Sequence, residues 1–254
     1  MVSYAGRHAE LYDLFYADKE YDSEALFVHK CLERFGRGPG SKLFELACGT
    51  GSHAFALERL GYEITATDNS EGMLDVAKEK AAAKGSRVQF RLQDMTELST
   101  DGSYDAVICL FDSIGYVRTN ENLGKVFAGV KKRLKTGGLF VFEFWHAAAM
   151  LCHYDPVRVR RWKTTAGELL RISETSLDCA KQLSSVSYSV YELNDDRTYS
   201  TLQETHTNRY FLVQEMAQWL TANGFSPLAW YSGFTDIESI DDQTWHVVAV
   251  ARAL

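Results

Sequence analysis

Three acidic residues and a glycine-rich turn in the first hundred residues have the types and spacing expected of a site for a charged ligand. Residues 45–54, "ELACGTGSHA", match the fingerprint G-x-G-x-x-G/A from Gly49 onward, which usually places a dinucleotide pyrophosphate on a helix N-terminus. Glu45 precedes this turn, and Asp68 and Asp94 close two later apolar segments. A pyrophosphate favours backbone N–H groups without a nearby carboxylate, whereas sulfonium and ammonium groups are stabilised by acidic and aromatic walls. The three carboxylates therefore favour a cationic ligand.

The elements that must position these residues follow from the hydrophobic pattern. From residue 42 to about residue 144, short apolar runs alternate with amphipathic segments, which predicts β-α-β units and a parallel sheet. Right-handed crossovers then bring the carboxyl ends of the strands to one edge, where the acidic residues meet. The predicted strands are residues 42–47, 62–68, 87–94, 104–111 and 139–145, and the predicted helices are residues 52–61, 70–85 (Ser70 as N-cap, Gly85 past the end) and 120–138.

The pattern changes after His146. Residues 168–211 alternate polar and β-branched side chains around a turn at 194–196, which predicts three inserted antiparallel strands. A helix over 212–224 and strands near 228–233 and 245–253 follow, and residues 6–16 predict an N-terminal helix over the sheet edge. The predicted fold class is α/β, with a doubly wound, Rossmann-like, mostly parallel seven-stranded sheet. We expect a core of residues 1–150 and 212–254, with 1–38 as an N-terminal lid, and an insertion at 151–211 that covers substrate or mediates dimerisation.

Composition limits the class of protein. The net charge of -7 argues against a broad nucleic-acid footprint, which needs clustered Lys and Arg. The longest apolar run, residues 137–150, contains Glu143 and His146 and is shorter than the roughly 20 residues of a membrane-spanning helix. The N-terminus lacks an apolar signal region, so we expect a soluble cytoplasmic protein. The five cysteines are scattered without metal-ligand spacing, which predicts buried free thiols and no metal.

Four motifs resemble those of the class I S-adenosylmethionine-dependent methyltransferases. They are "FELACGTG", "ATDNSEGML", "QDM" and "LKTGGLFVFEF". Shorter strings, "YDLFY", "ACGTGSH", "FDSIGYV" and "FEFWH", and the late antiparallel insertion resemble small-molecule N-methyltransferases. Among these, the aminosugar N,N-dimethyltransferases are the nearest and glycine N-methyltransferase is more distant. The sequence departs from the aminosugar enzymes at Asp112, where a small or amide residue is expected, and at residues 144–146, where a proline and paired aromatics are usual.

The resemblance implies S-adenosylmethionine as cofactor and S-adenosylhomocysteine as product. Asp68 is placed for ribose hydroxyls, which either cofactor type would offer, and Asp94 with the Met95 N–H suits the edge of adenine. The N-terminal segment commonly covers the methionine end of the cofactor. The implied cofactor-binding residues are Tyr12, Tyr16, Glu45, Ala47, Gly49, Thr50, Gly51, Asp68, Asn69, Met73, Gln93, Asp94, Met95 and Leu110.

Methyl transfer from a sulfonium is an in-line displacement, so the protein must align the reactants and exclude water. An amine acceptor must first lose a proton. His146 and Asp112, at the ends of the fifth and fourth predicted strands, are therefore the candidate catalytic residues. The alternatives are a surface histidine beside a tryptophan for His146 and an ordinary turn aspartate for Asp112.

Candidate substrate-binding residues lie farther along the chain. Tyr116 and Trp145 are predicted pocket walls, with core packing as the alternative. Arg158 and Arg160 in "VRVRRW" could clamp an anionic acceptor such as a nucleotide-linked sugar, or could form a solvated strand edge. Arg209 and Tyr210 are further candidates of the same kind.

Three functional hypotheses remain open at this point. The first is transfer of a methyl group to an amine of a small metabolite such as an aminosugar. The second is O-methylation of a hydroxyl or carboxyl group, and the third is a cofactor-binding scaffold or sensor without transfer. The expected partner is a small molecule, with neither nucleic acid nor membrane, and the chain is expected to be a monomer or a homodimer.

Overall fold

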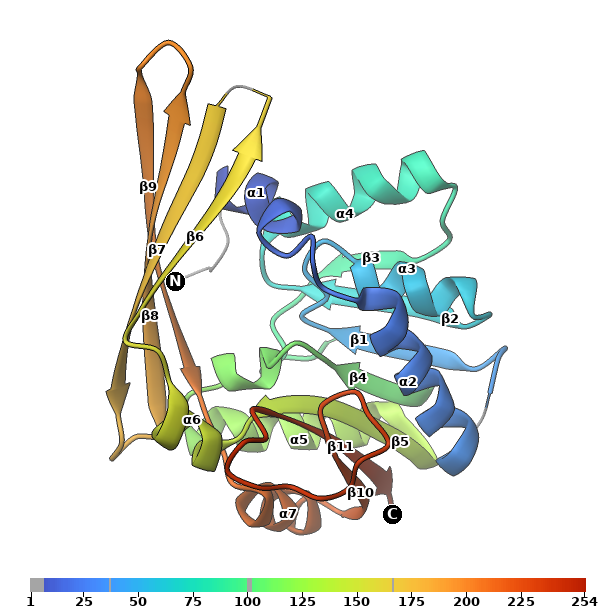
Figure 1. The fold of residues 1–254 in the computed structure, drawn as a ribbon. Coiled ribbons are helices and arrows are strands. Elements are labelled where there is room, and N and C mark those ends of the chain that lie inside the picture. The colour runs from blue at the N-terminus through green and yellow to red at the C-terminus, as the bar shows by residue number, and fades with distance from the viewer. Residues whose placement is uncertain (1–6, 37, 100–101, 166) are drawn as a thin grey trace.

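The computed structural model describes residues 7–36, 38–99, 102–165 and 167–254. Two sheets dominate the fold: a seven-stranded, mostly parallel sheet with helices on both faces, and a four-stranded antiparallel sheet that stands beside it (Figure 1). The predicted fold class is thereby confirmed.

The large sheet has the strand order β10-β11-β5-β4-β1-β2-β3. Strands β1 to β5 run parallel to one another, and β11 pairs antiparallel with both β5 and β10. The carboxyl ends of β1 to β5 therefore share one edge, as the sequence predicts. The strands are β1 (Lys42–Leu46), β2 (Glu63–Asp68), β3 (Gln89–Leu92), β4 (Tyr104–Cys109), β5 (Leu134–Trp145), β10 (Phe225–Ser232) and β11 (His246–Ala253).

Helix ends follow the local sequence in one case and depart from it in another. The Ser70 hydroxyl accepts the Met73 N–H at the start of α4, and Gly85 is left-handed just past its end, both as predicted. In contrast, α5 ends at Arg133 rather than at the glycines, because Leu134 already pairs with Tyr104 as the first residue of β5. The helices are α1 (Arg7–Phe15), α2 (Tyr21–Phe35), α3 (Ser52–Arg59), α4 (Glu71–Lys84), η1 (Ser113–Tyr116, a 3₁₀ turn), α5 (Asn120–Arg133), α6 (Ala147–His153) and α7 (Val213–Ala222).

Both faces of the large sheet are packed against helices. Alternate residues of β1 enter different cores: Leu43 packs with α2 and α3, and Phe44 packs with α5 and the phenylalanines of β5. Each fully buried Leu or Phe side chain contributes roughly 1.5–3 kcal/mol to folding. Burial on both faces leaves the strand ends as the edge where polar side chains can gather.

The second sheet has the order β6-β7-β8-β9 and holds one strand more than the sequence predicts. The additional strand, β6 (Val157–Thr164), lies at its edge and contains the arginine run. Charged side chains are common on edge strands, because they oppose pairing with other chains. Helix α1 packs on this sheet through Leu11 and Phe15, so it lies between the two sheets (Figure 1). The other strands are β7 (Gly167–Asp178), β8 (Leu183–Asn194) and β9 (Tyr199–Arg209).

The cysteines are free thiols, but they are not all buried as expected. Cys31, Cys48 and Cys109 are buried, whereas Cys152 and Cys179 are exposed. Within the described ranges, every helix is too short or too polar to cross a membrane.

Candidate active site

A cavity of about 960 Å³ lies between the carboxyl edge of the large sheet and strands β8 and β9. Side chains and backbone from the loops after β1, β2, β3 and β4 line one side, and β8 and β9 line the other. The structure thus brings together 13 of the residues predicted to bind or react, from both the cofactor and the acceptor sets. They are Tyr12, Tyr16, Ala47, Gly49, Asp68, Asn69, Met73, Gln93, Asp94, Met95, Asp112, Tyr116 and Trp145.

The loop after β1 is held open by left-handed backbone at Ala47, Gly49 and Gly51. Asp68 fixes this loop: its two carboxylate oxygens accept the Gly49 N–H at 2.8 Å and the Ser70 N–H at 2.9 Å. Burial raises the pKa of Asp68, although these N–H groups act to lower it. One carboxylate therefore joins the glycine turn to the start of α4.

Glu45 is a buried acid with an unsatisfied oxygen. Its side chain is 2% exposed, and its Oε2 has no hydrogen-bond partner among the described residues. Burial, and to a smaller extent the charge of Asp68, raise the pKa of Glu45 to about 8. An orphaned buried carboxyl is costly, so a ligand that donates hydrogen bonds here would be stabilised.

A smaller cavity of about 30 Å³ adjoins the large one, and three more of the predicted cofactor-binding residues line it. Glu45, Thr50 and Leu110 line it together with Tyr12 from α1. Thr50 Oγ1 donates to Asp13 Oδ1 at 2.7 Å, and Lys80 Nζ lies 2.9 Å from Asp13 Oδ2. These contacts tie α1 down over the glycine turn.

Gly51 lines neither cavity, which differs from its predicted contact with the cofactor. Its φ is +81°, and a Cβ atom there would lie 2.8 Å from Cζ of Phe90. The second glycine of the turn therefore allows close packing against an aromatic ring and a left-handed backbone, as N-cap of α3.

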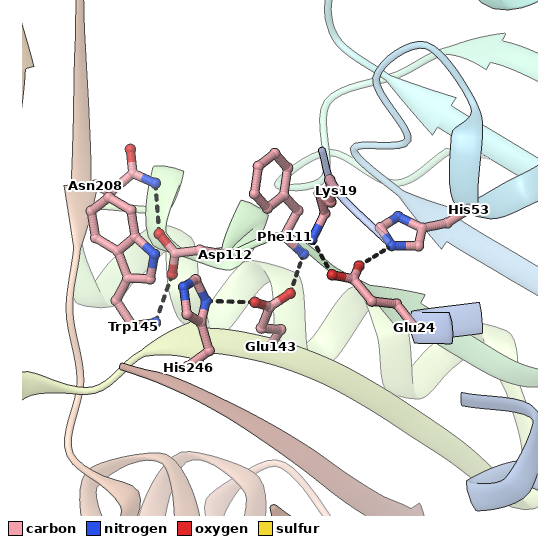
Figure 2. Close-up of polar contacts among 9 residues, drawn as sticks. All are labelled: Lys19, Glu24, His53, Phe111, Asp112, Glu143, Trp145, Asn208 and His246. Carbon is pink, nitrogen blue, oxygen red and sulfur yellow. Dashed lines mark hydrogen bonds and ion pairs between the residues drawn. The ribbon is translucent and has the colours of Figure 1, made fainter. Parts of the chain in front are cut away.

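The turn after β4 places two non-glycine residues, Phe111 and Asp112, in the left-handed region, with φ of 57° and 52°. Such a conformation costs about 1–3 kcal/mol per residue and persists only when its surroundings hold it. The Phe111 N–H donates to Glu143 Oε2 at 2.5 Å, and Asp112 accepts the Trp145 N–H at 2.8 Å and the Asn208 side-chain N–H at 2.7 Å (Figure 2). This turn is therefore fixed from β5 and β9 at once.

Burial raises the pKa of Asp112 to about 8, although Asn208 and the Trp145 N–H act to lower it. The Asp112 side chain is 2% exposed and lines the cavity. A cation placed beside this carboxyl would favour its charged form.

Behind Asp112, an ion pair supports the strained turn. His246 Nδ1 lies 2.6 Å from Glu143 Oε1 (Figure 2). Burial acts to raise the pKa of Glu143, but His246, Lys19 and the Phe111 N–H together hold it below its usual value. Burial acts to lower the pKa of His246, and Glu143 holds it above its usual value. Both shifts favour the charged pair.

A second set of charges continues from this pair toward α3. Lys19 lies over the Phe111 ring, 4.2 Å from its centroid, and contacts the carboxylate of Glu24. Glu24 Oε2 in turn lies 2.6 Å from His53 Nε2 (Figure 2). The segment between α1 and α2 is thereby attached to the turn after β4.

His146 does not reach the cavity, which differs from its predicted catalytic role. Its side chain is buried, and its backbone N–H donates to the Trp245 carbonyl while His146 N-caps α6. The prediction placed both Trp145 and His146 at the catalytic edge, but successive residues of an extended chain point to opposite sides. Only Trp145 faces the cavity.

The predicted arginine clamp is also absent from the cavity wall. Arg158 and Arg160 are exposed on β6, the edge strand, and Arg158 pairs with Asp155. The two arginines therefore lie on a solvated strand edge, which was the alternative to a substrate clamp in the sequence. β8 and β9, rather than β6, line the cavity.

Arg209 and Tyr210 also lie outside the cavity, where they join or pack against neighbouring elements. Arg209 joins β9 to two helices, because it donates to Asn120 Oδ1 and to Glu215 Oε1, each at 2.6 Å. Tyr210 is 1% exposed and packs with Ala147 in the cluster under α6. Neither residue lines the cavity.

The sequence interpretation missed the wall formed by β9. Residues 203–208, "QETHTN", all line the cavity, and Tyr188 of β8 joins them. His206 Nδ1 lies 3.0 Å from the Tyr116 hydroxyl, and His206 Nε2 lies 3.4 Å from Glu204 Oε2. The available signal was a run of six polar residues in a predicted strand, which is unusual where one face is packed on a core.

Known proteins resemble this chain over nearly its whole length. A methyltransferase domain family matches residues 43–138. A protein of Geobacillus sp. (strain WCH70), named "Putative methyltransferase", is 30% identical over 247 residues, covering 95% of this chain and 96% of its own. The dTDP-3-amino-3,4,6-trideoxy-alpha-D-glucopyranose N,N-dimethyltransferase of Streptomyces venezuelae is 32% identical over 140 residues, which cover 54% of this chain and 57% of the relative. The crystal structure of an S-adenosylmethionine-dependent methyltransferase from Clostridium acetobutylicum superposes with a TM-score of 0.82 at 23% identity. The superposition covers 96% of this chain and 97% of the other.

A parallel sheet with an acidic cavity at the carboxyl ends of its strands defines an α/β enzyme of the Rossmann-like type. With these relatives, the chain belongs to the S-adenosylmethionine-dependent methyltransferases. The resemblance drawn from the motifs is thereby confirmed. The residues present fit the cofactor chemically, because the orphaned Glu45 oxygen suits a ligand ammonium and acidic side chains outnumber the arginine among the residues that line the cavity.

Proposed function

We propose that this enzyme transfers the methyl group of S-adenosylmethionine to an amine of a small metabolite. The observation that carries the proposal is the charge of the cavity. Among the described residues that line it, the acidic side chains are Asp68, Asp94, Asp112 and Glu204, and the arginine is Arg118. An acidic cavity favours a cationic cofactor together with an acceptor that enters as an ammonium.

The cofactor side of the proposal rests on the loops after β1, β2 and β3. Asp68 would bind ribose hydroxyls through lone pairs that the Gly49 and Ser70 N–H groups leave available. Asp94, whose pKa is held low by Thr96 despite partial burial, would accept the adenine amine. Glu45 would bind the ammonium of the methionine end, under Tyr12. In this proposal the other predicted cofactor-binding residues that line one of the two cavities also contact the cofactor. They are Tyr16, Ala47, Gly49, Thr50, Asn69, Met73, Gln93, Met95 and Leu110.

The acceptor side rests on Asp112. Its carboxyl is held rigidly by Trp145 and Asn208, and it lines the same cavity as the cofactor candidates. We infer that Asp112 binds the acceptor amine, with Tyr116 and Trp145 as neighbouring walls. The strained turn after β4 would be the cost of this placement, since functional sites commonly store backbone strain.

When bound, S-adenosylmethionine supplies an electrophilic methyl group on a sulfonium. The contribution of this chain is to orient the acceptor nitrogen and to exclude water, since in-line transfer requires alignment more than covalent chemistry. α1, tied down by Asp13 and packed on the second sheet through Leu11 and Phe15, would provide the cover.

An aminosugar acceptor is supported by the relative from Streptomyces venezuelae, which is an N,N-dimethyltransferase of a dTDP-linked aminosugar. The arginine clamp for a linked nucleotide is not part of this proposal, because Arg158 and Arg160 lie away from the cavity. The proposed substrate class is therefore a small amine, with aminosugars as the first members to assay.

Binding of the cofactor is tested by titration calorimetry with S-adenosylmethionine and S-adenosylhomocysteine. We expect wild-type protein to bind both and Asp68→Ala to lose at least about tenfold in affinity, because a hydrogen bond to a charged group contributes about 1.5–3 kcal/mol. Asp75→Ala, an exposed aspartate on α4, is the matched control. Undiminished binding by Asp68→Ala, or preferential binding of NAD, would contradict the assignment.

The reaction is tested with matched panels of amines and hydroxyl compounds, including amino and hydroxy forms of the same sugars. We expect the mass of a methylated amine together with formation of S-adenosylhomocysteine. Methylation of hydroxyl or carboxyl compounds alone would favour O-methylation. Cofactor binding without turnover on any panel would favour a scaffold or sensor.

A cytoplasmic location and a monomeric or homodimeric state remain predictions from the sequence. Light scattering of the purified chain decides the second of these.

A further inference from the structure

Three residues of the cavity wall form a chain of contacts that the proposed function does not yet use. Tyr116 belongs to η1, and His206 and Glu204 stand two residues apart on β9, so their side chains share one face of the strand. The Tyr116 hydroxyl lies 3.0 Å from His206 Nδ1, and His206 Nε2 lies 3.4 Å from Glu204 Oε2. His206 is 4% exposed, and all three residues line the cavity.

The order of these contacts sets the direction in which a proton can move. Glu204 lies at ion-pair distance from His206 Nε2, and its negative charge favours the tautomer with the proton on that nitrogen. His206 Nδ1 then carries a lone pair and accepts the O–H of Tyr116. The same order of carboxylate, imidazole and hydroxyl lets a histidine take a proton from a hydroxyl in hydrolytic triads.

Titratable side chains from three elements face the His206 ring. Among them are Tyr116 from η1, Glu204 on β9 and Tyr188 from β8, whose ring centroid lies 5.4 Å away. A carboxylate at ion-pair distance stabilises an imidazolium, and the tyrosines bring no positive charge.

We propose that Tyr116, His206 and Glu204 form a relay that takes a proton from the acceptor's ammonium group before methyl transfer. This inference rests on the proposed amine acceptor. One N–H bond of the ammonium breaks, and its electron pair stays on nitrogen as the attacking lone pair. The proton goes to the Tyr116 oxygen, while the Tyr116 proton goes to His206 Nδ1. The resulting imidazolium, paired with Glu204, later returns the proton through Tyr116 to solvent.

Asp112 and the relay have different tasks in this scheme. Both carboxylate oxygens of Asp112 already accept N–H groups that fix them, so Asp112 is placed to anchor the ammonium. Tyr116 is the relay residue that contacts the acceptor. His206 and Glu204 act through Tyr116 and are positioning residues.

The test compares wild type with Tyr116→Phe on one amine acceptor from pH 6 to 10. Loss of the proton-accepting oxygen should lower kcat about 10²- to 10⁴-fold at pH 7. The deficit should shrink about tenfold per pH unit as solvent supplies the free amine, and an acceptor whose amine is already neutral at pH 7 should show almost none. Tyr199→Phe, at the exposed end of β9, is the matched control.

His206→Asn and Glu204→Gln should give the same pH profile with smaller deficits, because they act through Tyr116. A readout independent of turnover is ¹⁵N NMR of the His206 ring, which should show a proton on Nε2 and a shift of Nδ1 in Tyr116→Phe. A proton on Nδ1 in wild type, or a Tyr116→Phe deficit that is constant with pH, would overturn the relay alone. Methylation of hydroxyl compounds only would overturn the proposed function as well.

Discussion

The ion pair between buried Glu143 and partly exposed His246 gives a prediction whose magnitude and pH dependence both follow from the structure. Glu143 is 1% exposed, and its two oxygens contact His246 Nδ1 and the Phe111 N–H. The His246 side chain is 39% exposed, so water compensates part of its charge when Glu143 is removed, and the cost falls below the about 3–5 kcal/mol of a fully buried pair. Glu143→Ala should therefore lower the free energy of unfolding by about 2–3 kcal/mol, to which the unpaired Phe111 N–H contributes. Glu143→Gln, which keeps the shape, should cost about 1.5–3 kcal/mol.

The pH dependence follows from the sign of each shift. The pKa of Glu143 is lowered in the folded state, so its contribution to stability is present above its ordinary pKa of 4.5 and is lost as pH falls below that value toward the folded pKa. The pKa of His246 is raised, so its contribution is complete below its ordinary pKa of 6.5 and is lost as pH rises through the folded pKa. The difference between wild type and Glu143→Gln should therefore be largest between pH 4.5 and 6.5 and decrease on both sides.

Urea unfolding at pH 4, 5.5 and 8, followed by tryptophan fluorescence, measures this difference. Glu79→Gln, an exposed glutamate on α4, is the matched control and should show no pH-dependent effect. Because Glu143 also holds the strained turn, binding of the acceptor should weaken more than binding of the cofactor. A difference in stability that is constant across the three pH values would refute the assignment of a charged pair.

Other predictions use single contacts. Gly51→Ala should lower the unfolding free energy by about 1–3 kcal/mol in a thermal melt, because φ is +81° and the new Cβ would meet the Phe90 ring. Arg209→Met should cost about 3–5 kcal/mol in urea unfolding, since Glu215 loses its buried partner; an unchanged midpoint would contradict this. Asp112→Asn should raise the KM for the amine at least about tenfold with little change in cofactor affinity. Binding of a quaternary ammonium inhibitor, measured by calorimetry, should strengthen as pH rises toward 8, because Asp112, with a pKa of about 8, loses its proton; a flat profile would contradict this.

The grouping of the proposed cofactor-binding residues around one cavity was predictable because its signals are local. The glycine turn follows β1, Asp68 is the last residue of β2 and Asp94 lies just past β3, and parallel strands necessarily bring their carboxyl ends together. The N-cap Ser70 and the left-handed Gly85 are likewise set by residues within one turn of helix.

The proposed acceptor half depends on contacts between distant segments, which no local pattern encodes. Asp112 meets Asn208 across 96 positions, and Tyr116 meets His206 across 90. The orientation of the second sheet decides that β9 rather than β6 faces the cavity, so the arginine run lies away from it. His146 lies away from the cavity for a local reason, the alternation of side chains beyond the end of β5.

The second sheet has a consequence for how the enzyme family can diversify. One half of the cavity comes from loops of the parallel sheet, and the other from side chains of β8 and β9 within a continuous stretch between α6 and α7. Substitutions at residues 203–208 alter one wall while leaving the glycine turn and the carboxylates of β1 and β2 intact. The two walls thus come from separate segments of the chain, so the wall formed by β9 can be varied without changing the residues of the glycine turn.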